Sequence, residues 1–187
     1  MAKPPAATPG VWDRKSVPLA ATAVVKRIEG FSATPYDDNG AKPGGTWTIG
    51  YGTIMIAGVR VTPRTPPITE ARAVELLMKD MTGAAEAVNR RVLVPLKEFQ
   101  AAAVISWVYN LGEGNLRSST LLKRVNARDW PAVPGEIRKW INQEGKPLLG
   151  LLRRRWAEAA IFQGMDGTNA CVRAWNEIDD LGDWPAF

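Results

Sequence analysis

Residues 29–52 read EGFSATPYDDNGAKPGGTWTIGYG, and this stretch decides the fold expected for the 187-residue chain. It follows a segment from Ala20 in which apolar residues recur at helical spacing. Gly30 is a typical helix stop, so Glu29 is predicted in the last helical turn. The run over 36–61 is rich in glycine, threonine and turn-forming pairs, which predicts a small antiparallel sheet. The stretch therefore joins the end of a helix to a sheet.

The chain beyond this sheet is predicted to be mainly helical. Thr69 is a plausible cap for a helix with Leu77 on its apolar face. A strongly apolar helix from about Pro95 to Leu111, ended by Gly112, is expected to be the central buried helix. Further helices are predicted over 119–126, 134–142 and 148–163.

The two ends of the chain differ in composition from its middle. Residues 1–16 are rich in proline and alanine and carry no periodic apolar pattern, so they are predicted to be a flexible lead-in. Residues 17–164 are expected to form one domain, as suits a chain of this length. Residues 165–187 contain Trp175 and Trp184 and are expected to pack on that domain as an extension.

The composition excludes several classes of hydrolase. The chain has no histidine, which excludes Ser-His-Asp triads, Cys-His peptidase pairs and histidine-ligated zinc. Its one cysteine, Cys171, excludes an internal disulfide. Carboxylate chemistry remains, with lysine, tyrosine or an oxygen-ligated metal as further options. The net charge of +5 favours an anionic partner, but no long basic run predicts a nucleic-acid arm.

The sequence predicts no membrane anchor near its N-terminus. The longest apolar stretch there, residues 17–25, is far shorter than the ~20 residues that cross a bilayer. The run before the small residues at 21–23 is also too short for the apolar part of a signal peptide. We therefore expect neither a signal peptide nor stable membrane insertion.

Two carboxyl groups in contrasting environments suggest hydrolysis of a glycosidic bond, which needs one protonated and one ionised carboxyl. Glu29, at a helix C-terminus, faces partial negative charge that disfavours its ionised form. Asp38 lies on a glycine-flanked turn and is expected to be solvated and ionised. Each is an ordinary surface residue when taken alone, so the surrounding motifs decide the interpretation.

Those motifs resemble the phage lysozyme family, glycoside hydrolase family 24. The family pattern is a glutamate, a Tyr-x-Asp seven to nine positions on, a Thr-x-Gly-Tyr-Gly strand, a central helix with its Asn-x-Gly-x-Gly turn, and a closing helix with Gly-Leu, Arg-Arg and Glu. The matching residues are Glu29-Gly30-Phe31, Tyr36, Asp38, Thr48-Ile49-Gly50-Tyr51-Gly52, the segment 99–120 with the turn 110–114, and the segment 150–158. The resemblance covers about residues 20–164 in the family's order.

This resemblance implies an α+β, lysozyme-like fold with a small antiparallel β-sheet lobe and a mainly helical lobe. It implies hydrolysis of the β-1,4 bond between N-acetylmuramic acid and N-acetylglucosamine in peptidoglycan, with inversion and without metal or cofactor. Glu29 would be the proton donor, Asp38 would orient the attacking water, and Thr48 would assist it. An inverting enzyme of this kind holds its two carboxyl groups about 6.5–9.5 Å apart. The expected partner is the glycan strand rather than nucleic acid, and we expect a monomer.

Four further residues are expected to contribute to the substrate cleft. Tyr36 and Tyr51 lie in the predicted sheet beside the carboxyl pair. Asn110 can bind an acetamido group or, alternatively, cap the central helix. Arg153 matches a family arginine that pairs with the catalytic glutamate, or is a solvated helix charge. The tryptophans at 107, 130, 140 and 156 are expected in the core rather than as sugar platforms.

Two departures from the family pattern leave alternatives open. The segment between Asp38 and Thr48 is nine residues long, longer than in the family, so Asp37 and Thr46 are alternatives for the two roles. Thr53 stands where the family often has histidine. Because the family chemistry rests on carboxylates, this second departure concerns the detail of the cleft.

Two other functions remain as alternatives: a lytic transglycosylase, which uses one glutamate and leaves anhydro ends, and an inactive basic wall-binding module. A wall substrate without a signal peptide indicates a phage endolysin made in the host cytoplasm. Such a protein would reach the wall at lysis through a separate holin-like permeabilising protein. A virion-borne or secreted bacterial lysozyme is the alternative origin.

Overall fold

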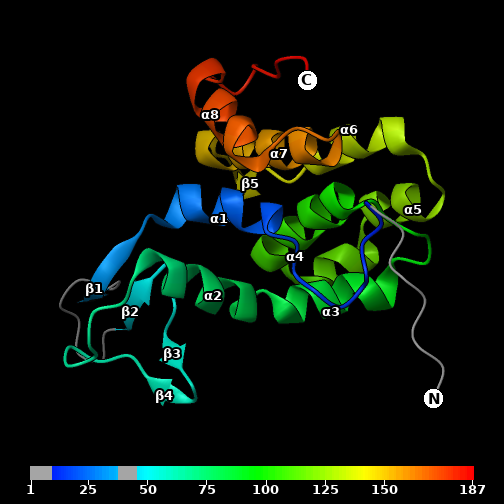
Figure 1. Ribbon diagram of the computed structural model, residues 1–187. Helices are drawn as coiled ribbons and strands as arrows, with labels where there is room; N and C mark the ends of the chain where they lie inside the picture. Colours follow the sequence, from blue (N-terminus) through cyan, green and yellow to red (C-terminus); the bar gives the residue numbers. More distant parts are fainter. Residues whose placement is uncertain (1–9, 38–45) are drawn as a thin grey trace, which may run out of the picture.

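The computed structural model describes residues 10–37 and 46–187, in which the short strands between residues 32 and 60 lie at one end of a mainly helical body (Figure 1). This confirms the predicted α+β fold. In chain order the elements are α1 (Ala20–Glu29), β1 (Ser32–Asp37), β2 (Trp47–Gly50), β3 (Met55–Ile56), β4 (Val59–Arg60), α2 (Glu70–Asp80), α3 (Thr82–Arg91), α4 (Glu98–Ser118), α5 (Thr120–Asn126), the 3₁₀ helix η1 (Trp130–Ala132), α6 (Val133–Arg138), β5 (Asn142–Gln143), β6 (Lys146–Pro147), α7 (Leu149–Phe162) and α8 (Gly167–Glu177).

The strands form separate antiparallel pairs. β1 pairs with β2, with Tyr36 opposite Thr48, and β3 pairs with β4 in a short hairpin. A third hairpin, β5–β6, stands where the sequence predicts the end of a helix. Glu144 and Gly145 both have positive φ values, 51° and 78°, and close that hairpin with a tight turn. Helix α6 ends at Arg138, before the predicted residue 142, and the hairpin follows it.

Helix α1 ends where the sequence predicts, but its buried face differs in part from the predicted one. Gly30 follows it with φ +68°, a conformation that glycine adopts readily. The apolar residues at helical spacing are those at 20, 24, 28 and 31; of these Val24 is buried but Ile28 is exposed, and the other buried residues are Ala21, Thr22 and Val25. Small side chains face inward because α4 and α8 both pack closely against α1.

Helix α4 is the central helix, and its straight part ends at the predicted position. All residues from 101 to 108 are buried, and Gly112 breaks the helix with φ 84° and ψ 159°. The start at Glu98 is later than the predicted Pro95. The side chain of Gln100 explains this start, because its Oε1 accepts a hydrogen bond from the backbone N–H of Lys97 at 2.9 Å.

Tryptophans contribute to the core as predicted. Trp107 and Trp156 are fully buried, while Trp130 and Trp140 are half-buried and pack against the core from outside. Trp107 and Trp140 meet edge to face with ring centroids 5.0 Å apart, an arrangement that aromatic rings favour.

The lead-in predicted to be flexible over 1–16 differs from the structure in its second half. Trp12 is buried, and its backbone N–H donates to the carbonyl oxygen of Leu96 at 3.0 Å. The side chain of Arg14 donates to the carbonyl oxygens of Asn89 and Val92. Residues 10–16, called the N-terminal strap below, are anchored by a single tryptophan. One tryptophan produces no periodic apolar pattern, so the sequence pattern did not predict that this segment is packed. Residues 1–9 lie outside the described part of the chain.

Residues 165–187 form α8 and a tail that share the core of the helical body. A Cβ atom on Gly167 would lie 2.8 Å from the Cβ atom of Ala23, so α8 approaches α1 very closely. The indole N–H of Trp156 donates to the carbonyl oxygen of Pro185 at 2.9 Å. Within the described ranges, no helix is long and apolar enough to cross a membrane.

Candidate functional site

Glu29 lies at the junction between the helical body and the sheet. It is the last residue of α1, and its side chain is exposed. Gly52, in the turn after β2, has φ +88°, and a Cβ atom there would lie 3.8 Å from Glu29 Oε2. The structure thus brings the predicted acid against the turn that ends the Thr-x-Gly-Tyr-Gly motif.

The predicted second carboxylate, Asp38, lies outside the described residues. The alternative, Asp37, is the last residue of β1 and is half-buried opposite Trp47. Asp37 stands at the end of the strand that follows Glu29.

Thr48 is buried in β2, opposite Tyr36 in the register. Its Oγ1 atom is buried and has no hydrogen-bond partner among residues 10–37 and 46–187. A buried hydroxyl usually has a partner, so this one is available for a bound water or ligand. The alternative, Thr46, precedes the strand and is half-buried.

Tyr51 ties α1 to α2 rather than presenting a free hydroxyl. The ring is buried, and its O–H donates to Glu70 Oε1 at 2.6 Å. Lys26 Nζ lies 3.1 Å from the same carboxylate oxygen. Burial and the Glu70 carboxylate both raise the pKa of Tyr51, while the Tyr51 and Lys26 contacts lower the pKa of Glu70. Tyr51 therefore helps to hold the last turn of α1.

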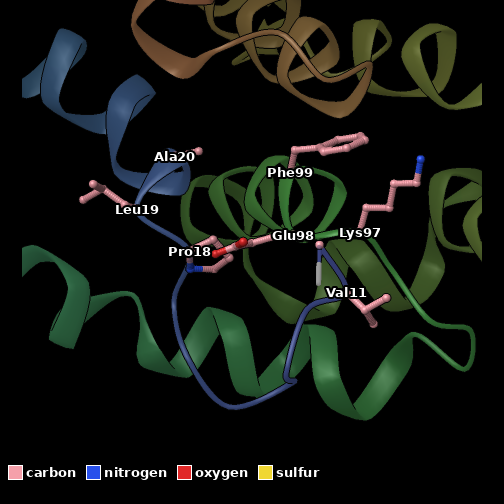
Figure 2. Close-up of a pocket in the computed structure, with 8 residues that line it drawn as sticks. Val11, Pro18, Leu19, Ala20, Lys97, Glu98 and Phe99 are labelled. Carbon is pink, nitrogen blue, oxygen red and sulfur yellow. The ribbon is translucent and has the colours of Figure 1, made fainter. Parts of the chain in front are cut away.

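Two cavities of the described chain do not have Glu29 in their lining. One groove of about 1030 Å³ lies between α1, α2 and α8, with Lys26, Tyr51 and Val172 in its lining. A smaller pocket of about 510 Å³ lies where the N-terminal strap meets the start of α4 (Figure 2). Figure 2 shows Lys97, Glu98 and Phe99 beside Pro18 and Leu19 in this pocket.

A third carboxyl group near the site was not predicted. Thr53 is buried, and its Oγ1 donates to Asp80 Oδ2, at the end of α2, at 3.0 Å. Burial raises the pKa of Asp80, against the lowering effects of Thr53 and Lys79. The only signal in the sequence is that Thr53 replaces the family's frequent histidine.

Tyr109, near the end of the straight part of α4, also lies close to these groups. Its pKa is raised by burial first, then by the charges of Asp80 and Glu29, while Arg154 lowers it. Charged residues of α1, α2 and α7 thus act electrostatically on this phenol. The sequence signal is weak: a tyrosine where the apolar stripe of the central helix ends.

Arg153 does not form the predicted ion pair with Glu29. Its Nε donates to the carbonyl oxygen of Ile178 at 2.9 Å, and its Nη2 lies 3.5 Å from Asp179 Oδ1. The C-terminal extension supplies both partners, which the family pattern does not contain. One residue on, about 100° around the helix, Arg154 faces inward and is 4% exposed.

A buried cluster of charges lies beside α4. Glu158 contacts the Nε atoms of both Arg154 and Arg155 at 3.3 Å, and it accepts a hydrogen bond from Ser106 Oγ at 2.9 Å. Asn110 Oδ1 accepts a hydrogen bond from Arg155 Nη2 at 2.7 Å. Burial lowers the pKa of Arg155 to about 10, although Glu158 opposes that shift. The oxygen of Asn110 is thus already used within the protein.

No group of three or more cysteine, aspartate or glutamate side chains that could hold a metal ion is found in residues 10–37 and 46–187.

The chain is similar to several characterised proteins. The phage lysozyme family model matches residues 26–158. The endolysin of Acyrthosiphon pisum secondary endosymbiont phage 1 is 33% identical over 147 residues, 75% of this chain and 92% of that protein. The SAR-endolysin of Enterobacteria phage P21 is 33% identical over 138 residues, 72% of this chain and 76% of that protein.

Solved structures agree with this assignment. The endolysin from Escherichia coli O157:H7 phage FAHEc1 has a TM-score of 0.65 at 31% identity, covering 78% of this chain and 91% of that chain. A P22 lysozyme mutant has a TM-score of 0.67 at 29% identity, covering 78% and 95%. The chain therefore belongs to the phage lysozyme family and is a lysozyme-type glycoside hydrolase of the endolysin kind.

Proposed function

We propose that this protein hydrolyses the β-1,4 bond between N-acetylmuramic acid and N-acetylglucosamine by the inverting mechanism of glycoside hydrolase family 24. The observation that carries the proposal is the position of Glu29. Its carboxylate lies at the end of α1 beside the Gly52 turn. That turn follows β2, the strand that carries the Thr48 hydroxyl, which has no partner among the described residues. This combines a proton donor with a free hydroxyl in the family's motif.

In the proposed mechanism, Glu29 is protonated and donates its proton to the glycosidic oxygen. The bond from that oxygen to the sugar C1 breaks, and the leaving sugar keeps the proton. Water attacks C1 from the opposite face, and the second carboxylate accepts the proton that the water loses. We assign this role to Asp38, with Asp37 as the alternative, and we assign Thr48 to binding the water.

The neighbouring residues have proposed roles that their contacts refine. Tyr36 lines the site beside Thr48. Tyr51 acts through Lys26 and Glu70 by fixing the last turn of α1, which carries Glu29. Asn110 donates from its amide nitrogen to an acetamido carbonyl, because its oxygen already accepts from Arg155.

Arg154, rather than Arg153, is the guanidinium that we assign to the surroundings of Glu29. Arg154 is buried, and its Nη2 atom has no hydrogen-bond partner in the structure. Arg154 and Glu29 both act on the pKa of Tyr109, in opposite directions, which supports placing them in the same neighbourhood.

We further propose that the protein acts as a monomer in host lysis and reaches the wall with the help of a separate holin-like protein. The net charge of +5 suits an anionic wall polymer. The endolysin relatives support the role in lysis, since their names describe that activity.

The substitution Glu29→Gln tests the proposed acid. It keeps the shape of the side chain but removes its transferable proton, so lysis of purified peptidoglycan should fall by about 10²- to 10⁴-fold. Glu75→Gln is the matched control, since Glu75 is an exposed glutamate paired with Arg72 on α2. Near-normal activity of Glu29→Gln would reject the mechanism.

Mass spectrometry of the digest separates hydrolysis from the transglycosylase alternative. Hydrolysis leaves reducing ends that carry oxygen from water, and digestion in ¹⁸O-labelled water marks them. Ends of the 1,6-anhydromuramic type would instead identify a lytic transglycosylase.

A further inference from the structure

The β3–β4 hairpin carries apolar side chains on its surface. It projects beyond α2, on the side of the molecule away from α1 (Figure 1). Positive φ values at Ala57 and Gly58, 50° and 83°, close it with a tight turn. Around this turn Ile54, Met55 and Val59, called the hairpin patch below, are 43%, 45% and 70% exposed. Single exposed apolar residues are ordinary, whereas adjoining ones rimmed by polar groups mark a contact surface.

An apolar pocket adjoins this patch. It has a volume of about 380 Å³, and its lining includes Val59 on β4 and Pro66 and Ile68 in the segment that follows. Ile56 stands opposite Val59 in the hairpin register, so both side chains lie on the same face, and both line the pocket. The hairpin therefore offers an apolar tip together with an apolar hollow beside it.

The charges around the hairpin patch all have the same sign. Residues 46–69 contain Arg60 and Arg64 but no aspartate or glutamate. Both arginines are exposed, and neither forms an ion pair with a residue in the described part of the chain. Arg60 stands opposite Met55 in the register, which puts a guanidinium group directly beside the patch. The patch is thus bordered by positive charge that is available to an anionic partner.

This composition suits a lipid surface better than a sugar. A sugar site needs polar groups placed to fix the ligand, yet residues 54–68 contain no aromatic, amide or carboxylate side chain. The hydroxyl oxygens of Thr62 and Thr65 accept hydrogen bonds from backbone N–H groups of their own turn. An anionic phospholipid instead offers phosphate to the arginines and acyl chains to the apolar residues.

We propose that the β3–β4 hairpin docks reversibly on the surface of a membrane that contains anionic phospholipid. The hairpin patch enters the boundary between headgroups and acyl chains, while Arg60 and Arg64 bind lipid phosphates. No segment crosses the bilayer in this arrangement. The docking is separate from the proposed function, because it uses none of the residues assigned to the reaction.

Sedimentation with lipid vesicles tests this docking on the full chain. Vesicles made of equal parts of phosphatidylglycerol and phosphatidylcholine are compared with vesicles of phosphatidylcholine alone. We expect binding to the anionic vesicles and much weaker binding to the neutral ones. The variant Arg60→Gln/Arg64→Gln should bind the anionic vesicles about 10- to 30-fold more weakly, or about 5-fold for each arginine. Val59→Ser should weaken binding by about 3- to 10-fold, because it removes an apolar contact.

Two control variants make the same kinds of change away from the hairpin. Lys123→Gln/Arg128→Gln removes an equal charge from exposed positions on and just after α5, which lies at the opposite end of the helical body from β3 and β4 (Figure 1). Leu93→Ser removes an apolar side chain that is 78% exposed between α3 and α4. Neither control should weaken vesicle binding as much as its hairpin counterpart. All four variants should digest lipid-free peptidoglycan normally, which shows that they are folded.

Several results would overturn the proposal. Equal binding to anionic and neutral vesicles would exclude recognition of the lipid charge. An equal loss in Lys123→Gln/Arg128→Gln would show that only the overall charge of the protein matters. Unchanged vesicle binding in both hairpin variants would mean that the hairpin does not touch the membrane. If their digestion of lipid-free peptidoglycan fell at the same time, the hairpin would be a contact for the wall polymer instead.

Discussion

Two charged clusters beside α4 have the same composition but opposite exposure. Each consists of one glutamate between two arginines. The buried cluster is Arg154, Arg155 and Glu158, and the exposed cluster is Arg90, Arg91 and Glu113. Side chains of the buried cluster are 0–5% exposed, and those of the exposed cluster are 31–54% exposed.

The shorter contacts, which belong to the exposed cluster, are expected to stabilise the fold less than the longer contacts of the buried cluster. The exposed pairs are short, 2.7 and 2.8 Å, whereas both buried pairs measure 3.3 Å. Water and salt screen the exposed charges, so their good geometry contributes little. In the buried cluster nothing replaces a lost partner, and the desolvation of an uncompensated charge is costly. Burial, rather than distance, should therefore decide which glutamate stabilises the fold.

Glu158→Gln should give the largest effect. It leaves two buried guanidinium groups without a countercharge, and removal of one partner from a buried ion pair costs about 3–5 kcal/mol of unfolding free energy. Urea denaturation at pH 7 measures the loss, and Glu113→Gln is its matched control. A loss of less than about 1 kcal/mol, as for an exposed pair, would mean that the two clusters do not differ.

Asn110→Ala should give an intermediate effect, because Asn110 supplies an acceptor for a guanidinium at the edge of the buried cluster. Leaving Arg155 Nη2 without that acceptor should cost about 1–3 kcal/mol. Urea denaturation measures this loss.

Asn110→Asp separates the two roles given to this residue. The aspartate keeps the acceptor for Arg155 but lacks the amide N–H proposed for the acetamido group. We expect stability near that of the unsubstituted protein, with weaker binding of a chito-oligosaccharide. Equal stability losses in both variants would show that the contact to Arg155 does not depend on the acceptor oxygen.

The parts of the fold that the sequence predicted depend on local signals. Gly30 ends α1, Thr69 caps α2 and Gly112 ends the straight part of α4, and each acts within one helical turn. The buried face of α1 was predicted only in part, since Val24 is buried but Ile28 is exposed, because α8 packs on this helix from more than a hundred residues away in the chain. Local spacing carries no information about that contact.

The candidate site also contains residues that local motifs identify and contacts that depend on distant parts of the chain. Glu29 and Thr48 were identified from motifs within the single stretch 29–52, and their catalytic roles stay predictions. The partners of Arg153 were not predicted, because Ile178 and Asp179 reach it from the C-terminal extension. Likewise, the bond from Thr53 to Asp80 joins residues 27 positions apart, so only the fold brings them together.

Glu113→Gln should give the smallest effect and the one most sensitive to conditions. Hydrogen bonds from Arg90 and then Arg91 lower the pKa of Glu113, so its contribution to stability is present above the ordinary carboxyl pKa. That contribution is lost as the pH falls through the lowered pKa, where the two proteins should converge. It should also vanish in 1 M NaCl, where the Debye length is about 3 Å. Urea denaturation at low and high salt checks this, with Glu158→Gln alongside, whose loss should persist in high salt. If both variants respond equally to salt, then water reaches Glu158 and the contrast between the clusters fails.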